Sequence, residues 1–216
     1  MLRQTKTNKY RETRRLAKVN KQIKSQVTKD ELPKTCPYCG GRMILKKIGD
    51  LDGTSYFKDQ EILVCENFNV CGCSVKVNTC DGKKVPFGIP ANRELKSLRR
   101  EAHYYMEYYT KLSGMTSSEI YEWLAYKQNI SRVRCHFSKM MEGQCRNMIQ
   151  IFLDAILEYA RVNPEKIRKK YQFQPFLYDE DYCDPRISGI WQETWSATDP
   201  KAKETIKKIQ ELLAKK

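Results

Sequence analysis

The spacing of apolar residues first indicates short strands. In residues 35–90, β-type runs at 43–48, 61–64 and 74–77 alternate with turn pairs such as Asp52-Gly53 and Asp81-Gly82. This pattern predicts a small β-sheet. The segment is too short and too polar to bury a core of its own, so we expect another stabilising group to hold it together.

From residue 91 the apolar spacing becomes helical. One set of residues repeats at steps of three and four: Leu95, Leu98, Ala102, Tyr105, Tyr109 and Leu112. This seam predicts an amphipathic helix ending at Ser113-Gly114, which packs on another helix or on a second copy of the chain.

Capping residues predict where the later helices begin and end. Thr116 and Glu119 form a capping box before the next helix, and a long amphipathic helix around 145–159 closes near Asn163 and Pro164. Asp199 and the proline after it predict the N-cap and first turn of a last helix. The intervening residues 165–198 are rich in aromatic side chains, and we expect them to be irregular and to wrap over the helices.

Composition and charge narrow the protein class. The 216 residues carry 40 Lys and Arg against 26 Asp and Glu, a net charge of +14, with 40% hydrophobic residues. No apolar run is long enough to span a membrane, and no export signal is evident, so we expect a cytoplasmic protein. In a reducing compartment, nine cysteines favour metal binding over disulfides. The excess positive charge favours a polyanionic partner, with nucleic acid as the leading candidate.

The sharpest chemical motif is a pair of cysteine clusters. Cys36 and Cys39 are separated by two residues and followed by two glycines, and Cys65, Cys71 and Cys73 lie further along the chain. Four thiolates around Zn²⁺ form a closed structural site, so the pattern predicts a zinc ribbon with one ion. Cys71 and Cys73 alternate on a strand-like segment, so only one of them can be the fourth ligand.

A wider set of motifs follows in a fixed order: CPYCGGRM, VCENFNVCGCSV, PFGIPANRELKSLRREAHYYM, YEWLA, RCHF and GQC. The combination resembles the zinc-finger-containing family of unknown function found in phage and mobile-element proteins, over about residues 35–155. The resemblance implies that the zinc ligands are Cys36, Cys39, Cys65 and Cys71, with Cys73 at a position that the family fills with a small non-ligand residue.

Basic residues suggest where nucleic acid would bind. Residues 1–34 contain eleven Lys and Arg and three acidic residues, a net charge of +8, and predict a basic helical arm. Arginines and lysines hold phosphates, and tyrosines can stack on unpaired bases. The predicted contacts are Arg11, Arg14, Arg15 and Lys18 in the arm, Arg93, Lys96, Arg99, Arg100, Tyr104 and Tyr108 on the first long helix, and Arg132 and Arg134 beyond it. The alternative is that the tyrosines pack on the ribbon or a partner helix while the basic residues are solvated.

The expected fold is α+β: a basic N-terminal helical arm (1–34), a small β zinc ribbon (35–90), and a mostly α-helical domain (91–163) on which the ribbon packs. An aromatic-rich wrap and C-terminal helix (164–216) complete the chain. The favoured function is a non-catalytic, zinc-binding, nucleic-acid-binding accessory protein of a phage, mobile-element or bacterial-defence nucleoprotein complex.

Two other functions fit the sequence less well. One is a protein-interaction module, a homodimer through the 95–112 seam, that modulates a ribonucleoprotein such as a CRISPR effector. The other is a small nuclease that uses His103 and His136, the only two histidines in the chain. No HExxH motif, P-loop or paired acidic metal motif supports an enzyme.

Overall fold

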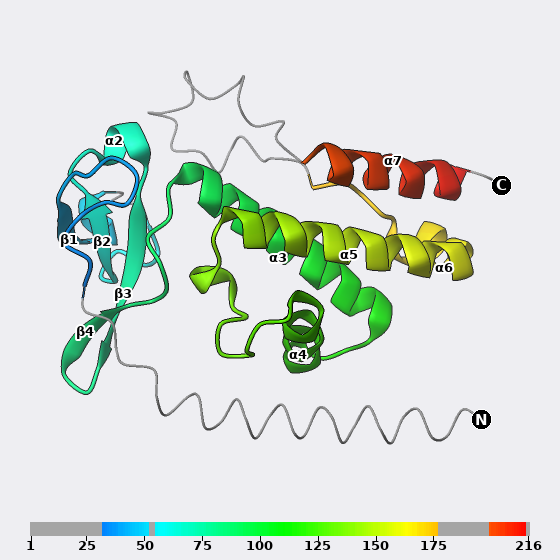
Figure 1. Ribbon diagram of the computed structural model, residues 1–216, viewed down its shortest axis with the longest axis horizontal. Coiled ribbons are helices and arrows are strands. Elements are labelled where there is room, and N and C mark those ends of the chain that lie inside the picture. The colour runs from blue at the N-terminus through cyan, green and yellow to red at the C-terminus, as the bar shows by residue number, and fades with distance from the viewer. Residues whose placement is uncertain (1–31, 52–54, 177–198, 215–216) are drawn as a thin grey trace. The chain divides into compact units, whose positions relative to one another are not determined.

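A computed structural model of the chain describes residues 32–51, 55–176 and 199–214 (Figure 1). The predicted basic arm, with Arg11, Arg14, Arg15 and Lys18, lies outside these residues. The chain divides into two compact units that interleave along the sequence. The first unit runs to Lys96 and includes Tyr121–Met140, and the second comprises Ser97–Ile120 and Met141–Lys216. The four-part division expected from the sequence stays a prediction.

The first unit contains a four-stranded antiparallel sheet in the order β1-β2-β3-β4. The strands are β1 (Met43–Lys47), β2 (Glu61–Cys65), β3 (Ser74–Cys80) and β4 (Lys83–Pro86). The first three confirm the predicted runs. The fourth was not predicted, because its sequence KKVP has no apolar alternation. It pairs with β3 across the two-residue turn at Asp81 and Gly82, both at positive φ.

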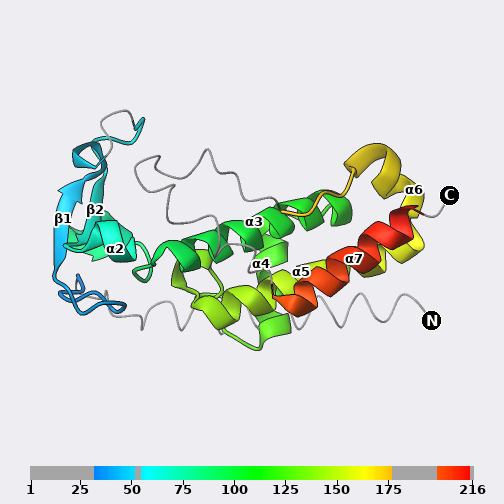
Figure 2. The same cartoon turned by 90° about the horizontal axis from the view of Figure 1, so that it is seen from above.

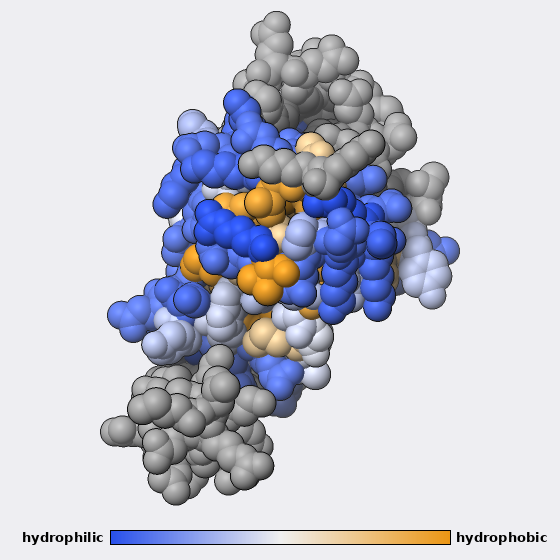
Figure 3. Space-filling model, turned by 90° about the vertical axis from the view of Figure 1, so that its right-hand side faces the viewer, coloured by the Kyte–Doolittle hydropathy of each residue, from blue (hydrophilic) through white to orange (hydrophobic). Residues whose placement is uncertain are grey.

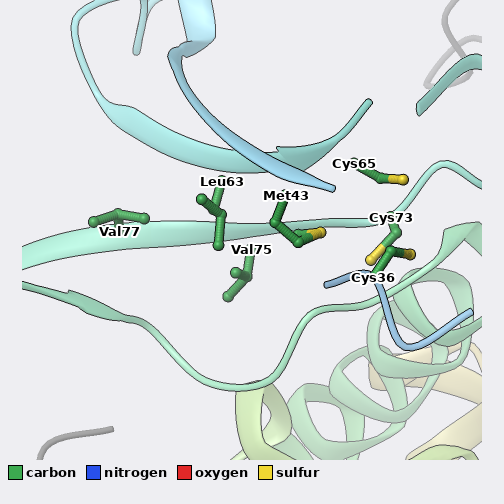
Figure 4. Packing of buried hydrophobic residues seen from close by; sticks show 7 residues of the cluster. All are labelled: Cys36, Met43, Leu63, Cys65, Cys73, Val75 and Val77. Carbon is green, nitrogen blue, oxygen red and sulfur yellow. The ribbon is translucent and has the colours of Figure 1, made fainter. Parts of the chain in front are cut away.

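One face of the sheet forms the core of this unit. Figure 4 shows Met43, Leu63, Val75 and Val77 gathered with three cysteines. The register explains this grouping, since Leu63 lies opposite Val75 and Met43 lies opposite Cys65. The cluster is small, as expected for a ribbon that depends on metal for much of its stability.

Short elements connect the strands to the long helices. A 3₁₀ turn, η1 (Ile48–Asp50), follows β1, and the four-residue helix α2 (Phe68–Cys71) lies between β2 and β3. Helix α3 (Arg93–Ser113) begins after Asn92, whose side-chain Oδ1 accepts a hydrogen bond from the backbone N–H of Leu95 at 2.9 Å. Asn92 is therefore its N-cap.

Helix α4 (Ser117–Gln128) begins at the predicted capping box. The backbone N–H of Thr116 donates to Glu119 Oε2 at 2.8 Å, and the backbone N–H of Glu119 donates to Thr116 Oγ1 at 3.4 Å. The 3₁₀ turn η2 (Phe137–Lys139) then leads toward the next long helix.

Two helices lie side by side in the second unit: α5 (Glu142–Val162) and α7 (Pro200–Ala214), as Figures 1 and 2 show. The amide of Gln150 donates to Thr205 Oγ1 at 3.0 Å between them. The predicted N-cap of α7 is confirmed, since the backbone N–H of Lys201 donates to Asp199 Oδ1 at 2.9 Å.

The expectation that residues 165–198 are irregular is wrong for residues 165–171, which follow α5 in the sequence. Helix α6 (Pro164–Lys166) and the π-helical turn η3 (Ile167–Tyr171) continue the chain in helical form. Pro164 starts a new helix because its missing N–H is not needed in a first turn. The next residues do pack on α3: the ring centroids of Phe173 and Tyr108 are 5.4 Å apart, and so are those of Phe176 and Tyr104.

The architecture is α+β with a zinc ribbon. Five of the six predicted seam residues of α3 are buried within a single chain: Leu95, Leu98, Ala102, Tyr105 and Leu112. The seam therefore needs no second copy of the chain to cover it.

The face drawn in Figure 3 is mostly hydrophilic, with a smaller group of apolar residues near its centre. Among the helices that the structure describes, none is both long and apolar enough to cross a membrane.

Candidate metal centre

Three elements bring four cysteines together. Cys36 and Cys39 lie in the loop before β1, Cys65 ends β2, and Cys71 ends α2. Their four Sγ atoms all lie within 4.8 Å of one another, with Cys39 Sγ 3.4 Å from Cys65 Sγ and Cys36 Sγ 4.0 Å from Cys71 Sγ. The structure thus gathers the four cysteines predicted as ligands.

The first pair is held by a tight backbone turn. The N–H of Cys36 donates to the carbonyl of Gly41 at 2.7 Å, and the N–H of Gly40 donates to the carbonyl of Cys36 at 3.0 Å. Gly40 has a φ of +72°, the left-handed conformation that glycine adopts without steric cost. The glycines after Cys39 therefore close this turn.

The second pair repeats this design. Gly72 follows Cys71, has a φ of +63°, and donates its N–H to the carbonyl of Phe68 at 2.8 Å. It ends α2 in the left-handed conformation typical of a helix C-terminus. Each cysteine pair thus ends in a cysteine followed by a left-handed glycine.

Backbone N–H groups point at the sulfurs with a common spacing. The N–H of Asn67 donates to Cys65 Sγ at 3.3 Å, and the N–H of Cys73 donates to Cys71 Sγ at 3.4 Å. In both cases the donor lies two residues after the cysteine. Such donors stabilise thiolates, which are the form that binds a metal ion.

The surroundings shift the thiol pKa values in opposite directions. The N–H of Gly41, helped by the thiol of Cys65, lowers the pKa of Cys39 to about 7. Desolvation raises the pKa of Cys65 to about 12 and also raises the pKa of Cys71. Of these three cysteines, Cys39 forms its thiolate most readily, while Cys65 and Cys71 must release their protons when a cation binds.

The fifth cysteine has a different position. Cys73 is fully buried beside Cys36 in the apolar cluster, and burial raises its pKa far above the ordinary value (Figure 4). Its contribution to the site is its backbone N–H, which donates to Cys71 Sγ. The expectation that Cys71 and Cys73 alternate on a strand-like segment is wrong, because Cys71 ends α2 and Gly72 turns the chain before β3 begins at Ser74.

The donor set fits one structural zinc ion. Zn²⁺ prefers four thiolates in tetrahedral geometry, and a site with four protein ligands leaves no position open for a substrate. Cys36, Cys39, Cys65 and Cys71 provide such a set from two turns of similar form. Zinc here would link the loop before β1 to the end of β2 and to α2.

Comparison with known proteins agrees with this geometry. The family model of the zinc-finger-containing domain (DUF3268) matches residues 32–155, more than half of the 216-residue chain. The chain belongs to this family. The family match includes all four cysteines of the metal centre and confirms the resemblance noted in the sequence. No curated protein and no solved structure matches the chain.

Two of the predicted phosphate contacts, Arg93 and Lys96, lie against the turn formed by α2 and Gly72. The guanidinium of Arg93 donates to the carbonyl of Asn69 at 3.1 Å, and the ammonium of Lys96 donates to the carbonyl of Gly72 at 2.8 Å and to Ser74 Oγ at 2.7 Å. These bonds tie the first turn of α3 to the metal centre. They give both residues a structural role within the family domain.

The other predicted nucleic-acid residues are spread over both units. In the first unit Arg134 is exposed, and the Arg132 guanidinium lies 4.6 Å from the centroid of the Tyr121 ring. In the second unit Arg100 is exposed and Arg99 hydrogen-bonds the thiol of Cys145.

The two predicted stacking residues are engaged within the second unit. Tyr108 is buried against Phe173, and the hydroxyl of Tyr104 donates to the carbonyl of Gln174 at 3.0 Å. Both rings therefore pack on residues 173–176, and not on the ribbon or a partner helix as the alternative expected. Their role in binding nucleic acid stays a prediction.

Each histidine has neighbours that account for its position. His136 stacks on Tyr121 with ring centroids 5.8 Å apart, and its Nδ1 lies 2.8 Å from Ser138 Oγ. His103 is exposed on α3, with its Nδ1 3.0 Å from Glu107 Oε1. Within the part of the chain that the structure describes, the four cysteines form the only group of three or more metal-ligating side chains.

The contacts that support the metal centre could not be predicted from the sequence. Lys96 and Gly72 are 24 positions apart, so no spacing rule pairs them. Tyr56 and Phe57, two exposed aromatic residues between β1 and β2, were not predicted as functional residues either. Their exposure could have been inferred, because adjacent aromatic residues in a turn-rich connection belong to no apolar pattern that would bury them.

Proposed function

We propose that this protein is a non-catalytic, zinc-stabilised, nucleic-acid-binding accessory protein of a nucleoprotein complex, of the phage, mobile-element or bacterial-defence kind. The zinc ion would keep the ribbon rigid and take no part in a reaction. Basic side chains on the ribbon unit and in the N-terminal segment would hold phosphates.

The observation that carries this proposal is the distribution of basic side chains that no carboxylate neutralises. Several exposed residues of the first unit form no ion pair with any described residue: Lys34, Lys46, Lys76, Lys83, Arg134 and Lys139. The second unit differs, since many of its basic residues pair with acids one turn away, as Lys208 does with Glu204 at 2.6 Å. Unneutralised cations beside a rigid ribbon favour binding of a polyanion.

The contacts of the histidines support a non-catalytic role. His136 stacks on Tyr121, and among the described residues neither histidine belongs to a group of three or more metal-ligating side chains. A metal-dependent nuclease would need such a group to hold its ion.

Burial of the α3 seam counts against the alternative function, a protein-interaction module that forms a homodimer through this helix. A homodimer through residues 95–112 would need an exposed apolar stripe, but Leu98 and Leu112 are buried in the single chain. This supports nucleic acid over a second copy of the chain as the first partner to test.

The proposal is tested by titrating labelled nucleic acid with zinc-loaded protein at several salt concentrations. We expect binding whose affinity falls steeply with salt, with a slope of roughly 0.7–0.9 per phosphate contact. Arg134→Gln and Lys139→Gln should each lower that slope, whereas Lys208→Gln, whose ammonium already pairs with Glu204, should not. No binding to any single- or double-stranded probe at low salt would contradict the proposal.

A further inference from the structure

Two adjacent aromatic side chains project from the connection between β1 and β2. Tyr56 is 92% exposed and Phe57 is 57% exposed, although burial of such rings is favourable. Their ring centroids are 5.2 Å apart and the ring planes are nearly perpendicular, at 87°. Because only an edge meets a ring face in this arrangement, most of the Tyr56 ring stays open to solvent.

The strand register places lysines beside these rings. Lys46 on β1, Ile62 on β2 and Lys76 on β3 lie opposite one another, on the face of the sheet that points away from the apolar cluster. The ammonium of Lys76 lies 5.3 Å from the centroid of the Phe57 ring. Phe57 therefore belongs to this face, and we call Lys46, Tyr56, Phe57, Ile62 and Lys76 the aromatic–lysine face.

The charges on this face have no acidic counterpart. Lys46 and Lys76 form no ion pair with a described residue, whereas Lys84 pairs with Glu61 on the opposite face of the sheet. The Cα atoms of Lys46 and Lys76 lie two strand spacings apart, roughly 10 Å, and two cations that no carboxylate neutralises suit a partner with regularly spaced negative charge.

We propose that the aromatic–lysine face binds single-stranded nucleic acid, with bases stacked on Tyr56 and Phe57 and backbone phosphates held by Lys46 and Lys76. This inference rests on the proposed function and specifies its ligand and its surface. An acidic peptide would use the lysines but leave the rings exposed, whereas unpaired bases use both.

The geometry favours a single strand over a duplex. Stacking needs an open base face, and in a duplex the base faces are covered by their neighbours. Base–aromatic stacking tolerates any sequence, since every base has a π-face, so we expect little base preference from Tyr56 and Phe57.

The test is fluorescence anisotropy with the full zinc-loaded chain and labelled strands of about 12 nucleotides, as DNA, as RNA and as the matching DNA duplex. We expect both single strands to bind more tightly than the duplex. Tyr56→Ala should weaken single-strand binding about 5- to 150-fold without changing the salt slope. Lys46→Gln and Lys76→Gln should each lower the slope by about 0.7.

Tyr126→Ala is the matched control, because Tyr126 is also an exposed tyrosine of the first unit, at 66%, but lies on α4. It should bind as the wild type does, and Tyr56→Trp should retain tight binding. Tyr56→Ala binding as tightly as the wild type, or Tyr126→Ala weakening binding equally, would overturn the inference. Tighter wild-type binding to the duplex would overturn it and leave the proposed function standing, whereas no binding to any probe would overturn both.

Discussion

The ammonium of Lys96, on the first turn of α3, donates a hydrogen bond of 2.8 Å to the backbone carbonyl of Gly72, the residue that follows the zinc ligand Cys71. A second bond from the same ammonium reaches Ser74 Oγ at 2.7 Å. The first turn of the helix that the sequence marked as a phosphate-binding surface is thus hydrogen-bonded to the metal centre through one of its basic residues.

Replacing Lys96 by methionine should destabilise the protein. The variant keeps an aliphatic chain of similar length but leaves the Gly72 carbonyl and the buried Ser74 without their donor, at a cost of about 1–3 kcal/mol in the free energy of unfolding. Urea unfolding of the zinc-saturated protein measures this loss in unfolding free energy. Lys111→Met, an exposed position on the same helix, should change stability little. Full stability combined with a lower salt slope for nucleic acid would instead make Lys96 a phosphate contact.

Gly72→Ala should be much more harmful than Gly82→Ala. Both glycines have positive φ, +63° and +72°, so both variants carry the left-handed backbone cost. A Cβ on Gly72 would lie 2.3 Å from Arg93 Cγ, whereas a Cβ on Gly82 meets nothing within 4 Å. We expect Gly72→Ala to lose about 1–3 kcal/mol more in unfolding free energy. Equal losses for the two variants would mean that Arg93 does not pack against this turn.

Glu101 should make stability fall as the pH rises. This carboxyl is buried in α3, and desolvation raises its pKa from the ordinary 4.5 to about 7, against the opposing effect of Arg146. The folded state therefore holds this proton between about pH 4.5 and 7 while the unfolded chain has lost it, so stability decreases across that window.

Glu101→Gln removes this titration. The variant should gain up to about 3 kcal/mol relative to the wild type as the pH rises from 4.5 to 7, measured by urea unfolding at a series of pH values. The pH dependence of the metal site is common to both proteins and cancels in the difference. A difference that stays constant with pH would show that Glu101 is ionised and solvated in the folded protein.

Zinc binding should release protons and strengthen with pH. Burial raises the pKa of Cys65 to about 12 and raises that of Cys71, so both are protonated near neutral pH before the metal binds. Release of these two protons alone makes the apparent affinity rise about a hundredfold for each pH unit, and the proton of Cys39 adds to this slope below about pH 7. Competition with a coloured chelator between pH 6 and 8 measures this slope, and a flat profile would contradict the pKa order of the cysteines.

The local elements of the fold were largely predictable from the sequence. Apolar steps of three and four predicted α3 and α5, and the Thr116–Glu119 capping box predicted the start of α4. These features depend on residues within one or two turns of each other, so a linear pattern contains them. The cysteine spacing predicted the metal site for the same reason, since each pair is local.

Features that depend on distant partners were not predictable. The positions of Arg93 and Lys96 beside the turn formed by α2 and Gly72 arise from contacts with residues 22 to 25 positions earlier. Strand β4 lacks its own apolar alternation and is defined by pairing with β3. Tyr108 fits the pattern of an exposed helical residue until Phe173 packs on it.

The central claim is that Cys36, Cys39, Cys65 and Cys71 hold one structural zinc ion. Native mass spectrometry of the wild type, Cys71→Ser and Cys73→Ser tests it most directly. The account predicts one zinc per chain for the wild type and for Cys73→Ser, and loss of stoichiometric zinc from Cys71→Ser. A Cys71→Ser protein that keeps its zinc, beside a Cys73→Ser protein that does not, would contradict it.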